Sequence, residues 1–172
     1  MPADATSSSH ARASWTPAEI GLAISSVLLI TLVAFEELAA TTIMPTVVAS
    51  FDAAPWYPIA SGAALAAQLS ATVVAGALAD WKGPRAVLFT GMALFAVGLI
   101  ISTVGPNIST FVAGRALQGL GGGLLVVPLY VLIGAVAAPA HRPSFFAAFS
   151  LSWVLPSLVG PAIAGYVTQV WG

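Results

Sequence analysis

Five long apolar runs, separated by short breaks rich in turn-forming residues, constrain this chain more than any other feature. A helix needs about 20 consecutive apolar residues to cross the hydrocarbon core of a bilayer. Runs of about that length cover residues 20–49, 56–79, 86–104, 108–137 and 144–170. Only 6% of the 172 residues are charged, against about 25% in a soluble domain. We therefore expect an all-α integral membrane protein with about five transmembrane helices.

The positively charged residues lie in alternate breaks. Arg12 lies in the N-terminal tail, Lys82 and Arg85 in the second break, and Arg142 in the fourth, whereas the first and third breaks carry neither Lys nor Arg. By the positive-inside rule this pattern predicts a cytoplasmic N-terminus in a multi-pass protein of the cell (inner or plasma) membrane.

The first residues are small and polar and differ from the rest of the chain. Residues 1–17 are predicted to form a disordered cytoplasmic tail, and residues 18–172 the transmembrane bundle. A cleavable signal peptide is excluded, because the tail is acidic and Ser-rich and the apolar run after it is too long.

Composition also excludes several classes of function. The formal net charge is −1, so no basic surface favours nucleic acid as a partner. Cysteine is absent, which removes thiol catalysis and Cys-ligated metals. His10 lies in the tail and His141 in a break, and neither lies in an apolar run beside a carboxylate. We expect no metal site, no cofactor and no enzymatic activity.

Two adjacent carboxylates, Glu36 and Glu37, interrupt the first apolar run. Each charge near a bilayer centre costs about 2.5–3.5 kcal/mol on insertion scales. Such groups persist if they are protonated, paired or exposed to water. One interpretation is that they reach the interface; the other is that a carboxyl in a cavity handles protons or cations. The sequence leaves both open.

The fourth run, "GRALQGLGGG", places a permanent cation on one helix face with an amide and two glycines: Arg115, Gln118, Gly119 and Gly122. Because Arg does not lose its proton inside a protein, it needs an anion or water. A Glu of the first run is the expected partner, and a structural and a functional bridge are equally compatible with the pattern. The glycines would let helices approach closely.

The second break, "GALADWKGPR", contains Gly76, Asp80, Gly83 and Arg85. Asp80 falls at a helix C-terminus, where the helix dipole disfavours an anion. Some positive group should therefore compensate it: Lys82, Arg85 or the N-terminus of a helix outside this sequence. Gly83 and the proline after it predict a tight turn.

Two further sets of residues are candidates for cavity lining or helix shaping. Polar side chains on one face of the second helix either line a cavity or form interhelical hydrogen bonds: Ser61, Gln68 and Thr72. Prolines and glycines of the fifth run are expected to shape its helix: Pro156, Gly160, Pro161 and Gly165. A kink that serves packing alone explains the second set equally well.

Taken in order, these motifs resemble the major facilitator superfamily of secondary transporters. "GALADWKGPRAVL" is similar to the family's loop motif G-x-x-x-D-R-x-G-R-K-x-x-L, with Trp81 and Pro84 at positions that are usually basic. "GRALQGLGGG" resembles R-x-x-Q-G-x-G-G, and "VGPAIAGYV" resembles G-P-x-x-G-G with Ala164 replacing one glycine. "FEELAATTIMP" is similar to the first-helix signature of the multidrug antiporter group.

The resemblance implies roles for several of these residues. Glu36 would occupy the acidic position of the first-helix signature and carry the proton, with Arg115 and Gln118 tuning it. Glu37 is an extra carboxylate without a counterpart in the signature and is the fourth candidate for proton or substrate coupling. Asp80 and Arg85 would help to lock the cytoplasmic gate.

Family members have twelve or fourteen helices and hold substrate between two six-helix halves. The resemblance therefore implies most of an N-terminal half, an incomplete transporter half that is not expected to transport alone. The expected function is proton-coupled export of small amphipathic molecules or drugs, driven by a proton gradient. The expected partners are the lipid bilayer, a small-molecule substrate and the missing C-terminal helices of the same transporter.

An alternative is a truncated, non-transporting membrane protein that acts as an assembly or regulatory partner. Gly119 and Gly123 have the small-xxx-small spacing that brings helices together. Such a protein would dock on its partner through this glycine face.

Overall fold

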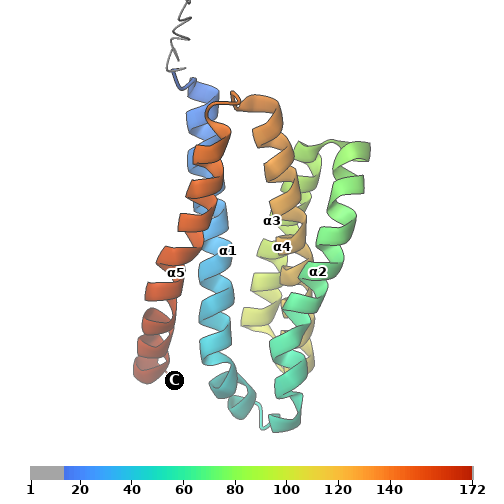
Figure 1. The fold of residues 1–172 in the computed structure, drawn as a ribbon. Coiled ribbons are helices and arrows are strands. Elements are labelled where there is room, and N and C mark those ends of the chain that lie inside the picture. Colours follow the sequence, from blue (N-terminus) through green and yellow to red (C-terminus); the bar gives the residue numbers. More distant parts are fainter. Residues whose placement is uncertain (1–13, 172) are drawn as a thin grey trace, which may run out of the picture.

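The computed structural model describes residues 14–171, and over that range the regular secondary structure is helical (Figure 1). The elements in chain order are α1 (Pro17–Ser50), the short 3-10 helix η1 (Ala54–Trp56), α2 (Tyr57–Lys82), α3 (Pro84–Val104), α4 (Ile108–Val136) and α5 (Arg142–Trp171). Five of these are long and apolar enough to cross a membrane. The predicted all-α membrane class is confirmed, whereas most of the predicted tail lies outside the described residues.

Helix α1 begins with a capping box. The Thr16 hydroxyl accepts a hydrogen bond from the Glu19 N–H at 3.2 Å, and the Glu19 carboxylate accepts one from the Thr16 N–H at 2.9 Å. Pro17 occupies the first turn, where its missing N–H leaves nothing unpaired. With 34 residues, α1 is about 51 Å long, more than the roughly 30 Å of a hydrocarbon core, so its ends project beyond that core.

The α2–α3 junction differs from the predicted helix ends at 79 and 86. Helix α2 continues to Lys82 and α3 starts at Pro84, so Gly83 alone separates them. Gly83 has φ +84° and ψ 147°, a backbone conformation that is almost restricted to glycine. Hydropathy marks only the part of a helix that lies in hydrocarbon, whereas Gly83 and Pro84 set where the helices end.

The helices pack in two groups that meet at the centre of the bundle. Helix α4 packs closely against α2 and α3, and α1 packs against α5, with fewer contacts between the groups (Figure 1). The close α2–α4 approach depends on Gly119, because a Cβ at that position would collide with the backbone of Ala64.

Apolar clusters connect the two groups in both halves of α1. In its N-terminal half, Ile30 packs with Leu129 of α4 and Phe145 of α5. Near its C-terminal end, Met44 packs with Ala60 of α2. Glu36 lies between these clusters along the helix, so α1 is anchored on both sides of its carboxylates.

Candidate functional site

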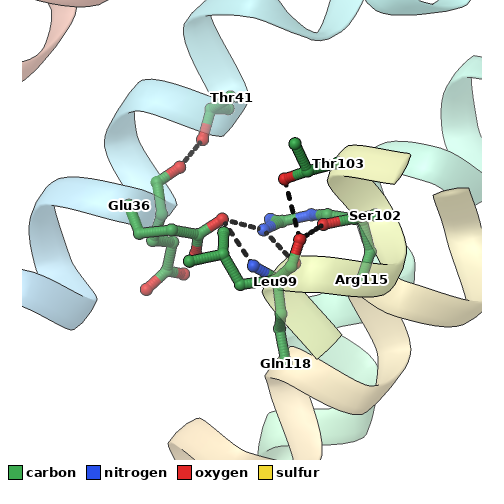
Figure 2. Close-up of polar contacts among 8 residues, drawn as sticks. Glu36, Thr41, Leu99, Ser102, Thr103, Arg115 and Gln118 are labelled. Carbon is green, nitrogen blue, oxygen red and sulfur yellow. Dashed lines mark hydrogen bonds and ion pairs between the residues drawn. The ribbon is translucent and has the colours of Figure 1, made fainter. Parts of the chain in front are cut away.

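Glu36 of α1 faces Arg115 and Gln118 of α4 (Figure 2). Nη1 of Arg115 donates to Oε1 of Glu36 and, at 3.1 Å, to Oε1 of Gln118. Nε2 of Gln118 donates to the same Glu36 oxygen at 3.2 Å. The structure therefore brings together three of the four residues predicted to couple protons and substrate, and each contacts the other two.

This cluster is largely removed from solvent. The side chains of Arg115 and Glu36 are 5% and 19% exposed, and Gln118 is 1% exposed. Removing one partner of a buried ion pair typically costs about 3–5 kcal/mol, because the remaining charge stays uncompensated. Arg115 keeps its charge at all accessible pH values, so the protonation state of the cluster depends on its acids.

Two cavities adjoin the Glu36 carboxyl. One, of about 370 Å³, is lined by Glu36, Arg115 and Ser102 and reaches Phe51 and Gly105, which follow the C-terminal ends of α1 and α3. The other, of about 540 Å³, is an almost wholly apolar groove between α1 and α3 that Glu36 also lines. The exposed part of Glu36 thus faces open space, whereas Arg115 and Gln118 are enclosed.

Glu37, the fourth predicted coupling residue, forms no direct hydrogen bond with the other three, although it lines the same small space between the helices. Its backbone carbonyl accepts a hydrogen bond from the Thr41 hydroxyl at 2.5 Å. The side chain is half-buried, and its Oε2 is fully buried with no hydrogen-bond partner among the described residues.

A third cavity, of about 250 Å³, lies between α1, α2, α4 and α5, and its wall is rich in aromatic side chains. Tyr130 contacts both Phe146 and Phe149 with ring centroids 5.6 and 5.5 Å apart, and Trp153 completes this wall. Gln68, one of the three candidate lining residues, contributes an amide to this lining.

The other two predicted lining residues have different surroundings. The Thr72 hydroxyl donates to the Gln68 carbonyl at 2.8 Å and lies 3.4 Å from the Gly123 carbonyl. This is the interhelical hydrogen bonding that the sequence offered as the alternative. Ser61 has a buried hydroxyl for which no partner is found in the described part of the chain.

The glycines of α4 contact helices of the same chain. Gly119 lies against Ala64 of α2, and a Cβ on Gly122 would be 3.9 Å from both Gln68 and Val33. Gly123 lies against the Gln68 backbone. The small-xxx-small face is therefore already covered by α2, which removes the observation that favoured an external docking partner.

The four residues of the predicted gate motif lie around the α2–α3 junction. Asp80 and Arg85 are both exposed, and neither forms an ion pair with another described residue. Gly83 forms the turn itself, and a Cβ on Gly76 would have open space around it. The expected compensation of Asp80 by Lys82 or Arg85 is therefore not an ion pair within residues 14–171.

The predicted helix-shaping residues lie inside α5, which stays helical through both Pro156 and Pro161. Gly160 faces α1, where a Cβ would lie 3.6 Å from Leu38 and 3.7 Å from Phe35. Gly165 has open space beside it.

Sequence reasoning missed a second buried polar cluster, at the N-terminal end of α1. Glu19 is 2% exposed, and its Oε1 accepts the Ala138 N–H at 2.8 Å and lies 2.9 Å from Nδ1 of His141. The Trp15 ring stacks on His141 with centroids 4.4 Å apart. The T-x-x-E capping box was the available signal. It predicts the helix start but not the contact with the α4–α5 loop.

Residues 7–172 match the family model described as Major Facilitator Superfamily. The chain belongs to the major facilitator superfamily. Within this superfamily it is 31% identical over 136 residues to an uncharacterized transporter of Schizosaccharomyces pombe, covering 79% of this chain and 23% of the relative. No solved structure matches.

Two further relatives of this superfamily protein carry more informative names. It is 28% identical over 128 residues to a multidrug transporter of Bacillus subtilis, covering 74% of this chain and 24% of that protein. It is 27% identical over 129 residues to an efflux pump of Dothistroma septosporum, covering 75% and 22%. The chain spans about a quarter of the length of these relatives.

Proposed function

We propose that the protein acts in a proton-coupled secondary transporter that exports small amphipathic molecules across the cell membrane, with the N-terminus in the cytoplasm. Family membership and relatives named as a multidrug transporter and an efflux pump support this proposal. The alternating positions of Lys and Arg support the orientation.

The observation that carries the proposal is the buried contact of Glu36 with Arg115 and Gln118. Glu36 is the titratable member of this cluster and faces a cavity that reaches the C-terminal ends of α1 and α3. In the proposed orientation these ends lie on the outer side. A proton entering from outside would neutralise Glu36 and weaken its attraction to Arg115, which would loosen α1 from α4.

The aromatic cavity is the proposed contact surface for the exported molecule. Its wall combines Tyr130, Phe146, Phe149 and Trp153 with the Gln68 amide. Aromatic and apolar walls with few polar groups suit ligands that are themselves mostly apolar. We propose that further helices complete the substrate pathway and that the five helices do not transport alone.

The test of this proposal is transport by the full-length protein reconstituted in vesicles with an imposed proton gradient. We expect Glu36→Gln to reduce gradient-driven accumulation of a fluorescent amphipathic dye to the level of empty vesicles. Dye exchange down its own gradient should persist, because a neutral residue still permits binding. Asp52→Asn, which neutralises an exposed carboxylate after α1, is the matched control and should accumulate dye normally. Unchanged gradient-driven accumulation in Glu36→Gln would overturn the assignment.

A further inference from the structure

Two buried atoms near the ion pair have no hydrogen-bond partner among the described residues. They are Oε2 of Glu37 and Nε of Arg115. A buried polar atom without a partner is costly, and in native structures it usually marks a bound water or ion. One atom is an acceptor and the other is a donor, so a single water molecule could satisfy both.

A small chamber between α1, α2, α3 and α4 has both Glu37 and Arg115 in its lining. Its polar lining consists of Glu36, Glu37, Gln68, Arg115 and Gln118. The chamber measures about 10 Å³, which is close to the minimum that one water molecule needs. A buried water also requires two to four polar partners, and this lining offers carboxylate, guanidinium and amide groups.

We infer that this chamber binds one water molecule that bridges Glu37 to Arg115, and that Glu37 is the second anion of Arg115. When Glu36 takes up a proton, Glu37 keeps the guanidinium compensated through this water. The inference rests on the proposed function for its meaning in transport, because only a transporter that protonates Glu36 needs the second anion.

The charges around the chamber support this assignment. Among its lining residues in the described part of the chain, Glu36 and Glu37 come from α1 and Arg115 from α4, while α2 and α3 contribute the uncharged Gln68 and Phe95. A proton on Glu36 alone would leave a buried, unpaired guanidinium, which strongly disfavours that state. A carboxylate at the next position of α1 removes this obstacle and leaves the first carboxyl free to titrate.

The test is a set of variants of the chain in lipid nanodiscs, compared by melting temperature. E36Q and E37Q each leave Arg115 one anion and should lower the melting temperature slightly. E36Q/E37Q leaves none, so its loss should exceed the sum of the single losses. E36Q/E37Q/R115Q removes the uncompensated cation and should regain most of that loss. A double variant that fails to insert while the triple variant inserts would support the inference equally.

Two outcomes would overturn the assignment of Glu37. Additive losses would mean that the two carboxylates do not share Arg115, and a triple variant as unstable as the double variant would mean that the loss has another cause. A separate variant tests the bridging water. Gln68→Met replaces an amide of the chamber lining with an apolar side chain of similar length and so removes a polar partner of the water. A coupling between Glu36 and Glu37 that survives this change would overturn the water bridge. None of these results depends on transport, so failure here and failure of the proposed function are distinguishable.

Discussion

Glu36 and Arg115, 79 positions apart in the chain, form a buried ion pair between α1 and α4. The pair joins the two packing groups of the bundle, α1 with α5 and α4 with α2 and α3. Apolar clusters join the same groups on either side of the pair along α1, so the pair is a buried polar contact within this junction. A change of charge on Glu36 would act at the junction.

Replacing Arg115 should separate the effect of charge from that of geometry. Arg115→Lys keeps the charge, but Nη1 of Arg115 makes both contacts and the shorter Lys side chain ends before that position, so it should lose one of the two contacts and destabilise the chain by about 1 kcal/mol. Arg115→Met leaves Glu36 unpaired and should cost about 3–5 kcal/mol. Unfolding in mixed micelles measures both, and equal losses for Lys and Met would contradict the importance of the charge.

Gly119→Ala should weaken the contact between α2 and α4. Its Cβ would collide with the backbone of Ala64, which cannot move as a flexible side chain does, so we expect a loss of about 1–3 kcal/mol. Gly62→Ala is the control, since nothing lies within 4 Å of a Cβ there and alanine favours a helix by up to about 1 kcal/mol. Equal unfolding free energies for the two variants would show that the close approach is absent.

Gly83→Ala should strain the α2–α3 junction. The backbone at Gly83 has φ +84°, and a residue with a Cβ held in such a region costs about 1–3 kcal/mol. Gly76→Ala, one loop-motif glycine earlier and with open space for a Cβ, should be neutral or stabilising. A lower melting temperature for Gly76→Ala than for Gly83→Ala would contradict the predicted backbone strain at Gly83.

Glu19→Ala should release the α4–α5 loop from the start of α1. The variant removes the acceptor of the Ala138 N–H and half of the capping box. We expect faster hydrogen–deuterium exchange at Ala138 and a lower melting temperature. Ser25→Ala, which removes only an exposed hydroxyl bonded within its own helix, is the control. Unchanged exchange at Ala138 would exclude the contact.

The sequence was sufficient to predict the membrane class and to suggest an Arg–Glu pair between the first and fourth apolar runs. Few charges occur in the apolar runs, and an Arg that cannot lose its proton needs an anion. A Glu of the first run was therefore the expected partner of Arg115. The resemblance narrowed the choice to Glu36. The choice between the two carboxylates otherwise depends on how α1 is rotated, which only packing decides.

Other features could not be predicted because they depend on contacts distant in the chain. His141 lies more than a hundred residues after Glu19, and no local pattern connects a capping residue to a loop that follows three more membrane-spanning helices. From the sequence, Thr72 could equally line a cavity or form an interhelical hydrogen bond. The glycines of α4 bring that helix close to α2, and the Thr72 hydroxyl lies within hydrogen-bond distance of the Gly123 carbonyl. The predicted second helix ends at residue 79, whereas α2 continues to Lys82. The difference arises because the last turn of α2 is polar and hydropathy does not detect it.

The most direct test of the central claim, that Glu36 changes its protonation state, is infrared difference spectroscopy of the chain in nanodiscs between mildly alkaline and mildly acidic buffer. We expect a protonated-carboxyl band that grows on acidification and is absent in Glu36→Gln, while Asp52→Asn retains it. A band of the same size in Glu36→Gln, or no band from the wild-type chain, would contradict the claim that Glu36 carries the proton.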